Sequence, residues 1–133
     1  MHSYSVSPVS SILDIDAASF QRLTSPSDPF LSQAFIGALE RHGAAGPQLG
    51  WMPHHLVARD ADGRIAGILP LYAKSNSFGE FIYDWSWAQA FEQSGIAYYP
   101  KLFSGLPYTP ATGPRLWIRA GPERDALQAA LID

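Results

Sequence analysis

The sequence contains no cysteine and few charged residues. Without a thiol the chain cannot form a disulfide framework, a thiolate zinc site, an iron–sulfur cluster or a cysteine nucleophile, and it suits a reducing compartment. Charged residues make up 16% of the chain, against 47% apolar residues. Disordered chains have the opposite balance, so this composition predicts a packed globular core.

The chain also lacks an excess of positive charge and a long apolar run. Nine Lys and Arg residues against twelve Asp and Glu residues give a net charge of −3, so no basic stripe is present to bind DNA or an anionic membrane. The longest apolar run, Ile65 to Tyr72, is far shorter than the roughly 20 residues of a spanning helix, and Met1 to Tyr4 has no signal-peptide character. We expect a soluble cytoplasmic protein that binds neither DNA nor membrane.

A length of 133 residues predicts a single domain over residues 1–133. Folding at this length removes roughly two-thirds of the unfolded chain's surface from water, which is enough for a core without a metal or disulfide. The last apolar helical pattern, around Leu127 and Leu131, ends at Asp133 with no Gly or Asn cap and with an acid where the helix dipole favours a cation. We therefore expect a domain truncated at its C-terminus, with further catalytic residues beyond residue 133.

Capping residues and hydrophobic spacing predict the first elements. Tyr4 to Val9 has the period of a strand, with a proline that suits a strand end or a sheet edge. Asp14 or Asp16 is placed to cap a helical turn. Asp28 precedes Pro29 as an N-cap precedes a first helical residue, and the pattern predicts one helix over 29–42 that carries Leu31, Phe35 and Leu39 and stops at Gly43.

A hairpin is predicted in the middle of the chain. Gly43 to Pro53 is rich in glycine and proline and reads as a loop packed down by Trp51. Residues 56–59 and 64–72 are apolar strand-like segments that flank Asp60-Ala61-Asp62-Gly63. Because Asp-Gly supplies the positive-φ turn of a hairpin, these segments are expected to pair in antiparallel fashion.

Aromatic residues concentrate in the next segment, since residues 72–108 hold eleven of the seventeen aromatics and only five charged side chains. Asp84 to Ser94 is predicted to be helical, with Gly95 as its stop and with Trp87, Ala88, Ala90 and Phe91 on its inner face. Strands are then predicted over Lys101 to Leu106 and at Arg115 to Ile118, before a last helix opened by Gly121-Pro122-Glu123.

This order of elements resembles the first half of the Gcn5-related N-acetyltransferase (GNAT) fold, an α/β fold with a mixed sheet flanked by helices. The sequence also resembles a narrower group, the FemAB-like predicted N-acyltransferases of peptidoglycan biosynthesis. The resemblance covers about Asp28 to Leu116, and its main segments are Asp28-Pro29-Phe30-Leu31-Ser32, Leu69-Pro70-Leu71-Tyr72, Asp84-Trp85-Ser86-Trp87-Ala88, Tyr98-Tyr99-Pro100-Lys101-Leu102 and Thr112-Gly113-Pro114-Arg115-Leu116.

The resemblance implies an acyl-CoA site in this chain. In GNAT enzymes one strand splays from its parallel neighbour, and its free N–H groups bind the thioester and pantetheine. The strand Lys101 to Leu106 takes this place, parting from its neighbour near Leu106. The following loop then holds the pyrophosphate, through Thr109, Thr112, Gly113 and Arg115. The alternative is that Arg115 is a surface arginine and that the threonines bond their own turn.

Acyl transfer to an amine needs a base, and two acids lie among the aromatic residues of the segment 72–108. Asp84 and Glu80 are the carboxyl groups that burial would most affect, and we expect burial to raise their pKa toward neutrality. A helix N-cap would account for Asp84 without catalysis. Trp85, Trp87, Tyr98, Tyr99 and Lys101 are candidates to line a substrate groove, although aromatic residues more often form core or interface.

No metal site is expected. His54 and His55 are adjacent on an extended segment and therefore point to opposite faces, one packed and one exposed. We expect an N-acyltransferase that moves an acyl group from acetyl-CoA or another acyl-CoA to a small-molecule or peptide amine. The alternatives are a FemAB-type aminoacyl transferase, which alone would require tRNA, and a non-enzymatic aromatic-rich binding module. An open sheet edge would allow a homodimer.

Overall fold

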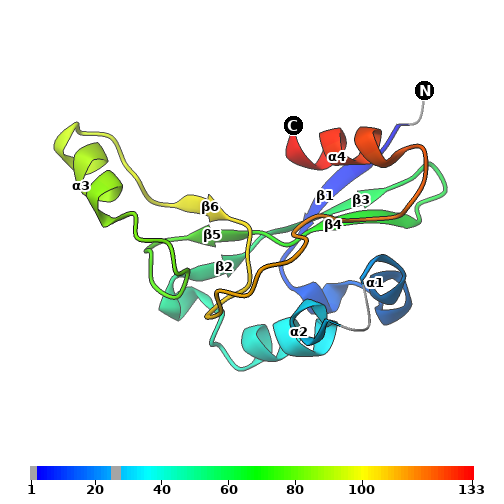
Figure 1. Ribbon diagram of the computed structural model, residues 1–133, viewed down its shortest axis with the longest axis horizontal. Coiled ribbons are helices and arrows are strands. Elements are labelled where there is room, and N and C mark those ends of the chain that lie inside the picture. Colours follow the sequence, from blue (N-terminus) through cyan, green and yellow to red (C-terminus); the bar gives the residue numbers. More distant parts are fainter. Residues whose placement is uncertain (1–2, 25–27) are drawn as a thin grey trace.

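The computed structural model describes residues 3–24 and 28–133 and contains two antiparallel sheets with helices packed around the larger one (Figure 1). The larger sheet has the order β1-β3-β4-β7, formed by β1 (Ser5–Val9), β3 (His55–Arg59), β4 (Ile65–Leu69) and β7 (Trp117–Ile118). The smaller sheet has the order β2-β5-β6, formed by β2 (Trp51–Pro53), β5 (Tyr72–Lys74) and β6 (Lys101–Phe103).

Helices cover both faces of the larger sheet, which gives the α/β layering expected from the sequence. In Figure 1, α1 and α2 lie on one face and α4 on the other, while α3 stands apart at the far end of the smaller sheet. The helices are α1 (Ala17–Leu23), α2 (Gln33–Arg41), α3 (Trp85–Gln93) and α4 (Arg124–Ile132), with short 3-10 turns at η1 (Ile12–Asp14), η2 (Pro29–Leu31) and η3 (Pro47–Leu49).

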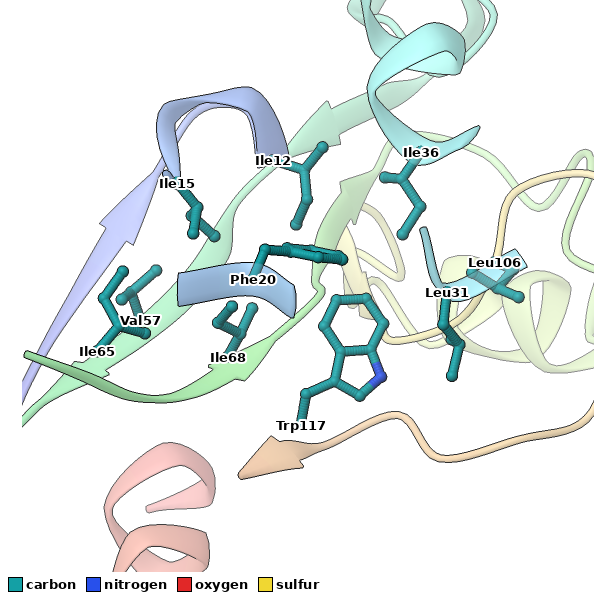
Figure 2. Close-up of a cluster of buried hydrophobic side chains, with 10 residues drawn as sticks. All are labelled: Ile12, Ile15, Phe20, Leu31, Ile36, Val57, Ile65, Ile68, Leu106 and Trp117. Atoms are coloured by element: carbon teal, nitrogen blue, oxygen red, sulfur yellow. The ribbon is translucent and has the colours of Figure 1, made fainter. Parts of the chain in front are cut away.

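The main core lies between the larger sheet and the layer formed by η1, α1, η2 and α2. Figure 2 shows Phe20 stacked edge-on against Trp117, with ring centroids 5.2 Å apart. Around this pair gather the buried side chains of Ile12, Ile15, Leu31, Ile36, Val57, Ile65, Ile68 and Leu106. On the opposite face of the sheet, Gly67 allows α4 to pack closely, because a Cβ at this position would lie only 2.9 Å from Leu131 Cδ1.

One continuous ribbon links the two sheets. Trp51 pairs with Lys74 in the smaller sheet and Leu56 pairs with Leu69 in the larger one, and the register is the same in both. The ladder of backbone hydrogen bonds is interrupted at Pro70, because proline has no N–H to donate. The two sheets are thus the two ends of one bent hairpin, and the site at one end is mechanically joined to the core at the other.

The structure confirms several predicted elements and corrects others. Asp16 caps α1, Asp28 caps η2 and the 56–59/64–72 hairpin forms, although its second strand breaks at Pro70 into β4 and β5. The single helix predicted over 29–42 is wrong, because Ser32 is extended (ψ 142°) and its Oγ caps a new helix at Phe35 N.

Two further corrections concern the ends of elements. The predicted loop 43–53 ends in strand β2, because Trp51 to Pro53 pair with β5. The strand predicted over Lys101 to Leu106 stops at Phe103, and only two residues of the segment 115–118 are paired. Gly43 and Gly95 have positive φ values of 77° and 72°, as helix stops should.

The predicted splaying of two parallel strands near Leu106 is wrong for the part of the chain that the structure describes. All five strand pairings there are antiparallel. Residue Leu106 instead lies buried in the main core. Strand β6 has one neighbour, β5, so its other edge has no partner strand among residues 3–24 and 28–133, and pairing with a second chain there stays a prediction.

Candidate functional site

Four charged side chains form a cluster at the end of the smaller sheet: Lys74, Glu80, Asp84 and Lys101, here called the ionic cluster. Lys74 and Lys101 are directly paired on β5 and β6, and like charges in that position repel. The repulsion is offset because Glu80 lies between them, with Oε1 3.8 Å from Lys74 Nζ and Oε2 2.7 Å from Lys101 Nζ. Asp84 also pairs with Lys101.

The turn after β5 aims Glu80 inward. Gly79 has φ 78° and Phe81 has φ 59°, and a positive φ is costly for a phenylalanine. The outcome is that Glu80 is 5% exposed while Phe81 is 53% exposed. Gly79 is required here, because a Cβ would lie 2.6 Å from Tyr108 Cε1. Such strain next to buried charge is typical of functional sites.

Lys101 is the member of the ionic cluster that reaches furthest toward solvent. Its side chain is 16% exposed, against 8% for Asp84 and 0% for Lys74 and Glu80. Its ammonium donates to Ser77 Oγ at 2.9 Å and lies 5.6 and 5.9 Å from the ring centroids of Tyr98 and Tyr99. The surroundings of Lys101 therefore form a cage for a primary ammonium.

Hydroxyl groups complete the cage. Tyr98 donates to Asp84 Oδ2 at 2.6 Å, and the hydroxyls of Tyr99 and Ser77 lie 2.6 Å apart. The structure thus brings together five of the predicted site residues, namely Glu80, Asp84, Tyr98, Tyr99 and Lys101.

The pKa of Asp84 moves opposite to our expectation. Burial would raise it, but hydrogen bonds from Lys101 and Tyr98 outweigh burial and lower the pKa of Asp84 to about 2. Burial also acts against the charge of Lys101, yet hydrogen bonds to Asp84 and Glu80 raise the pKa of Lys101 above its usual value. Asp84 is therefore a permanent anion that holds a permanent cation, and it is poorly suited to be a base near neutral pH.

Lys74 was missed as a site residue. Its side chain is fully buried, its Nζ lies 3.6 Å from the centroid of the Trp51 ring, and it donates to Phe78 O at 3.1 Å. Burial lowers the pKa of Lys74 to about 8, with the Glu80 charge opposing the shift. The available signal was the two-residue spacing from Tyr72, which places both side chains on the buried face of β5.

Several carboxylate oxygens in the ionic cluster have unused capacity. Glu80 Oε2 is paired with Lys101 Nζ at 2.7 Å, whereas Glu80 Oε1 is buried without a hydrogen-bond partner, 3.8 Å from Lys74 Nζ. Asp84 Oδ1 is likewise buried without a hydrogen-bond partner. Buried acceptors are normally satisfied, so unsatisfied ones call for an explanation, and a second ammonium group would supply the missing donors.

The predicted tryptophans line the surface and do not pack into the core. Helix α3 has no buried residue, and Trp85 and Trp87 are 46% and 66% exposed. The inner face predicted for this helix, including Phe91 at 37% exposure, is therefore wrong. Trp85 does contact the turn before the helix, with its ring centroid 5.2 Å from that of Phe78.

The loop proposed for the pyrophosphate bonds to itself. Thr109 Oγ1 accepts from Ala111 N at 3.2 Å. Arg115 turns its guanidinium back onto carbonyl groups of the same loop, including Gly113 O at 3.0 Å, while Thr112 and Gly113 are exposed. These contacts do not fit a pyrophosphate-binding loop, so acyl-CoA binding stays a prediction.

A second polar network is structural. As predicted, His54 is exposed and His55 is buried. His55 Nδ1 accepts from Leu71 N at 3.0 Å, so its Nε2 carries the proton and donates to Glu40 Oε1 at 2.6 Å. Glu40 Oε2 also accepts from Ser11 Oγ at 2.7 Å. The network joins α2 to the bend of the ribbon and leaves His55 no free nitrogen for chemistry.

The described residues, 3–24 and 28–133, contain neither a group of metal-ligating side chains nor a helix that could cross a bilayer. Within them no three His, Asp or Glu side chains are grouped as metal ligands would be. Within the same residues no helix is both long and apolar enough to cross a bilayer.

Comparison with known families identifies the chain. The family model FemAB_like, described as peptidoglycan biosynthesis/recognition, matches residues 11–133, which include the whole ionic cluster. Comparisons with curated proteins and with solved structures give no match. Because the family model covers nearly the full length, the chain belongs to the FemAB_like family.

Proposed function

We propose that this chain is the amine-binding part of an N-acyltransferase of peptidoglycan biosynthesis. The observation that carries the proposal is the ionic cluster: a caged ammonium, Lys101, beside two buried carboxylate oxygens without a hydrogen-bond partner, Glu80 Oε1 and Asp84 Oδ1. An acceptor amine enters such a site as an ammonium and donates to these oxygens. The family to which the chain belongs supports a peptidoglycan-related acceptor.

The residues take distinct roles in this proposal. Glu80 accepts a proton from the acceptor ammonium, which leaves a neutral amine. The amine nitrogen forms a bond to the acyl carbon of the donor and loses a second proton, and the bond from that carbon to its oxygen or sulfur leaving group breaks, so that the leaving group takes up this proton and departs as a hydroxyl or thiol. Lys101 stabilises the negative oxygen that develops on the carbonyl, and Asp84 holds Lys101 in place.

The test is an amide-forming assay on the chain with a peptide amine of a peptidoglycan precursor as acceptor. Acetyl-CoA and aminoacyl-tRNA are supplied in separate arms, and the product is identified by mass spectrometry. Glu80→Gln should lower the rate by at least about a hundredfold, and Lys101→Ala by a similar factor. Asp62→Asn, in an exposed ion pair with Arg64, should leave the rate unchanged.

The donor arms decide between the two forms of the proposal. A rise in melting temperature with acetyl-CoA, together with acetylated product, would favour the acyl-CoA donor. Product from aminoacyl-tRNA alone would favour the aminoacyl transferase. If Glu80→Gln and Lys101→Ala both react at the wild-type rate, the ionic cluster takes no part in the transfer reaction.

A second candidate is a recognition module without catalysis. The exposed aromatic residues of α3 and the antiparallel sheets favour it, because a binding surface needs no splayed strand. Acceptor binding by the chain, with no product from either donor, would support this candidate.

A further inference from the structure

An exposed aromatic surface borders the ionic cluster. It comprises five side chains with exposed fractions from 46% to 83%: Phe78, Phe81, Tyr83, Trp85 and Trp87. In Figure 1 the segment that carries them, the turn after β5 and helix α3, projects from the body of the molecule. Exposed aromatic side chains concentrated on one segment in this way are characteristic of a binding site.

The charge around this surface excludes one class of ligand. Residues 75–100 include no Lys, Arg or His, and their charged residues are Glu80, Asp84 and Glu92. The cations that flank this segment in the sequence, Lys74 and Lys101, are already paired with the acids of the ionic cluster. A nucleotide- or lipid-linked diphosphate needs cationic or N–H donors, and residues 75–100 offer it no cationic side chain.

The geometry of the surface suits an uncharged ring with an apolar face. A depression of about 190 Å³ is lined by Ser77, Phe78, Gly79, Phe81, Ile82, Tyr83 and Trp85. The Phe78 and Trp85 rings meet edge to face, so this part of the wall is ordered before a ligand arrives. Ser77 also accepts from Lys101 Nζ, so the depression opens directly beside the ionic cluster.

We propose that the aromatic surface binds the sugar of a phosphate-free saccharide–peptide, whose amine enters the ionic cluster. This inference rests on the proposed function and specifies its acceptor: a fragment or segment of peptidoglycan rather than a diphosphate-linked precursor. Apolar faces of sugar rings and N-acetyl methyl groups pack on exposed aromatic rings without any need for charge. The aromatic rings therefore supply the affinity, and the acids of the ionic cluster fix the position of the amine.

The test is calorimetric titration of the chain, with no donor present, with a purified disaccharide–peptide that has a free amine. Tyr83→Ala and Trp85→Ala should each weaken binding about tenfold. Phe30→Ala, an exposed aromatic beside α2 at 38% exposure, is the matched control and should bind as wild type. Tyr83 is 83% exposed, so its replacement should leave the circular dichroism spectrum unchanged.

The same peptide carried on a nucleoside diphosphate should bind no more tightly, and added salt should weaken the disaccharide–peptide complex only slightly, because its one charged contact is the amine in the buried ionic cluster. The inference is overturned if the diphosphate form binds tenfold tighter, or if both alanine variants bind as wild type. It is also overturned if the surface proves to be a self-association interface, with a dimer that Tyr83→Ala dissociates and no saccharide binding.

Failures of the two proposals are distinguishable. Ring-dependent saccharide binding without transfer from any donor would contradict the proposed transferase and leave this inference standing. Transfer with unaltered acceptor KM in Tyr83→Ala and Trp85→Ala would contradict the inference and leave the transferase standing.

Discussion

At the residue scale, the fate of each buried charge depends on how many partners surround it. Asp84 receives donors from Lys101 and Tyr98 and stays ionised far below neutral pH. Lys74 is fully buried with one carboxylate 3.8 Å away, so burial prevails and lowers its pKa. The sequence indicated that this region would hold buried acids, but the direction of each pKa shift depends on contacts between residues on different segments.

Lys74→Met should remove a pH dependence of stability. The pKa of Lys74 is about 8 in the folded protein and about 10.5 when unfolded, so between these values the unfolded chain binds more protons. The wild-type unfolding free energy should therefore rise with pH over this window, relative to Lys74→Met, by at most about 1.4 kcal/mol per pH unit. Urea denaturation of both proteins at several pH values measures this rise. A difference in unfolding free energy between wild type and Lys74→Met that stays constant from pH 8 to 10.5 would contradict the prediction.

Glu40→Gln should destabilise the protein at neutral pH by about 1–3 kcal/mol, because Ser11 and the Ile12 N–H lose a charged acceptor. Burial alone would raise the pKa of Glu40, but hydrogen bonds from His55 and Ser11 outweigh burial and lower it. The stabilisation is thus full above the ordinary pKa of 4.5 and is lost as the pH falls below it.

Urea denaturation of wild type and Glu40→Gln at neutral pH and below pH 4.5 measures this effect. The difference between the two proteins should shrink in acid. Asp62→Asn serves as the control, because its ion pair with Arg64 is exposed and is worth less than about 1 kcal/mol. A Glu40→Gln effect that is independent of pH would show that the carboxylate charge is not what stabilises the network.

At the element scale, helices of similar sequence character have very different roles. Both α2 and α3 have nine residues and an apolar stripe, but α2 buries Ile36 against the larger sheet and α3 buries nothing. Spacing predicts that a helix has an apolar face, not what the face contacts. This is why the position of α3 was predicted correctly from Asp84 and Gly95 while its packing was not.

Helix α3 should exchange its amide hydrogens faster than α2. With no buried side chain, α3 can open locally at little cost in free energy, whereas opening α2 breaks the main core. Hydrogen exchange followed by NMR or mass spectrometry measures this difference. The protection factors of the α2 amides should be more than about tenfold larger than those of the α3 amides. Equal protection in the isolated chain would mean that α3 is covered by a partner, such as a second copy.

At the scale of the whole molecule, the bent ribbon couples the site to the core. The register is unbroken from Trp51 opposite Lys74 to Leu56 opposite Leu69, and His55 bonds Leu71 at the bend. The smaller sheet, with three short strands, would have little independent stability. Its order therefore depends on the larger sheet through this ribbon.

We expect both sheets to unfold together. Trp51 lies in the smaller sheet and Trp117 in the core of the larger one, so their indole N–H signals report the two ends separately. Both signals should disappear at the same urea concentration in wild type. Separate transitions in wild type would contradict the coupling. His55→Ala leaves Leu71 N and Glu40 without this partner. The substitution should weaken the coupling between the two sheets and lower the free energy of unfolding by about 1–3 kcal/mol.

The sequence by itself determined the local features of this protein. Caps at Asp16 and Asp28, the turn at Gly63, the opposed faces of His54 and His55 and the family-level resemblance all depend on neighbours in the chain, and the structure and comparisons confirm them. Only the tertiary structure decided the antiparallel pairing of β6 with β5 and of β7 with β4, the burial of Lys74 and the exposure of α3. Each of these depends on which distant segment lies alongside, and the hydrophobic effect that selects it has no direction along the chain.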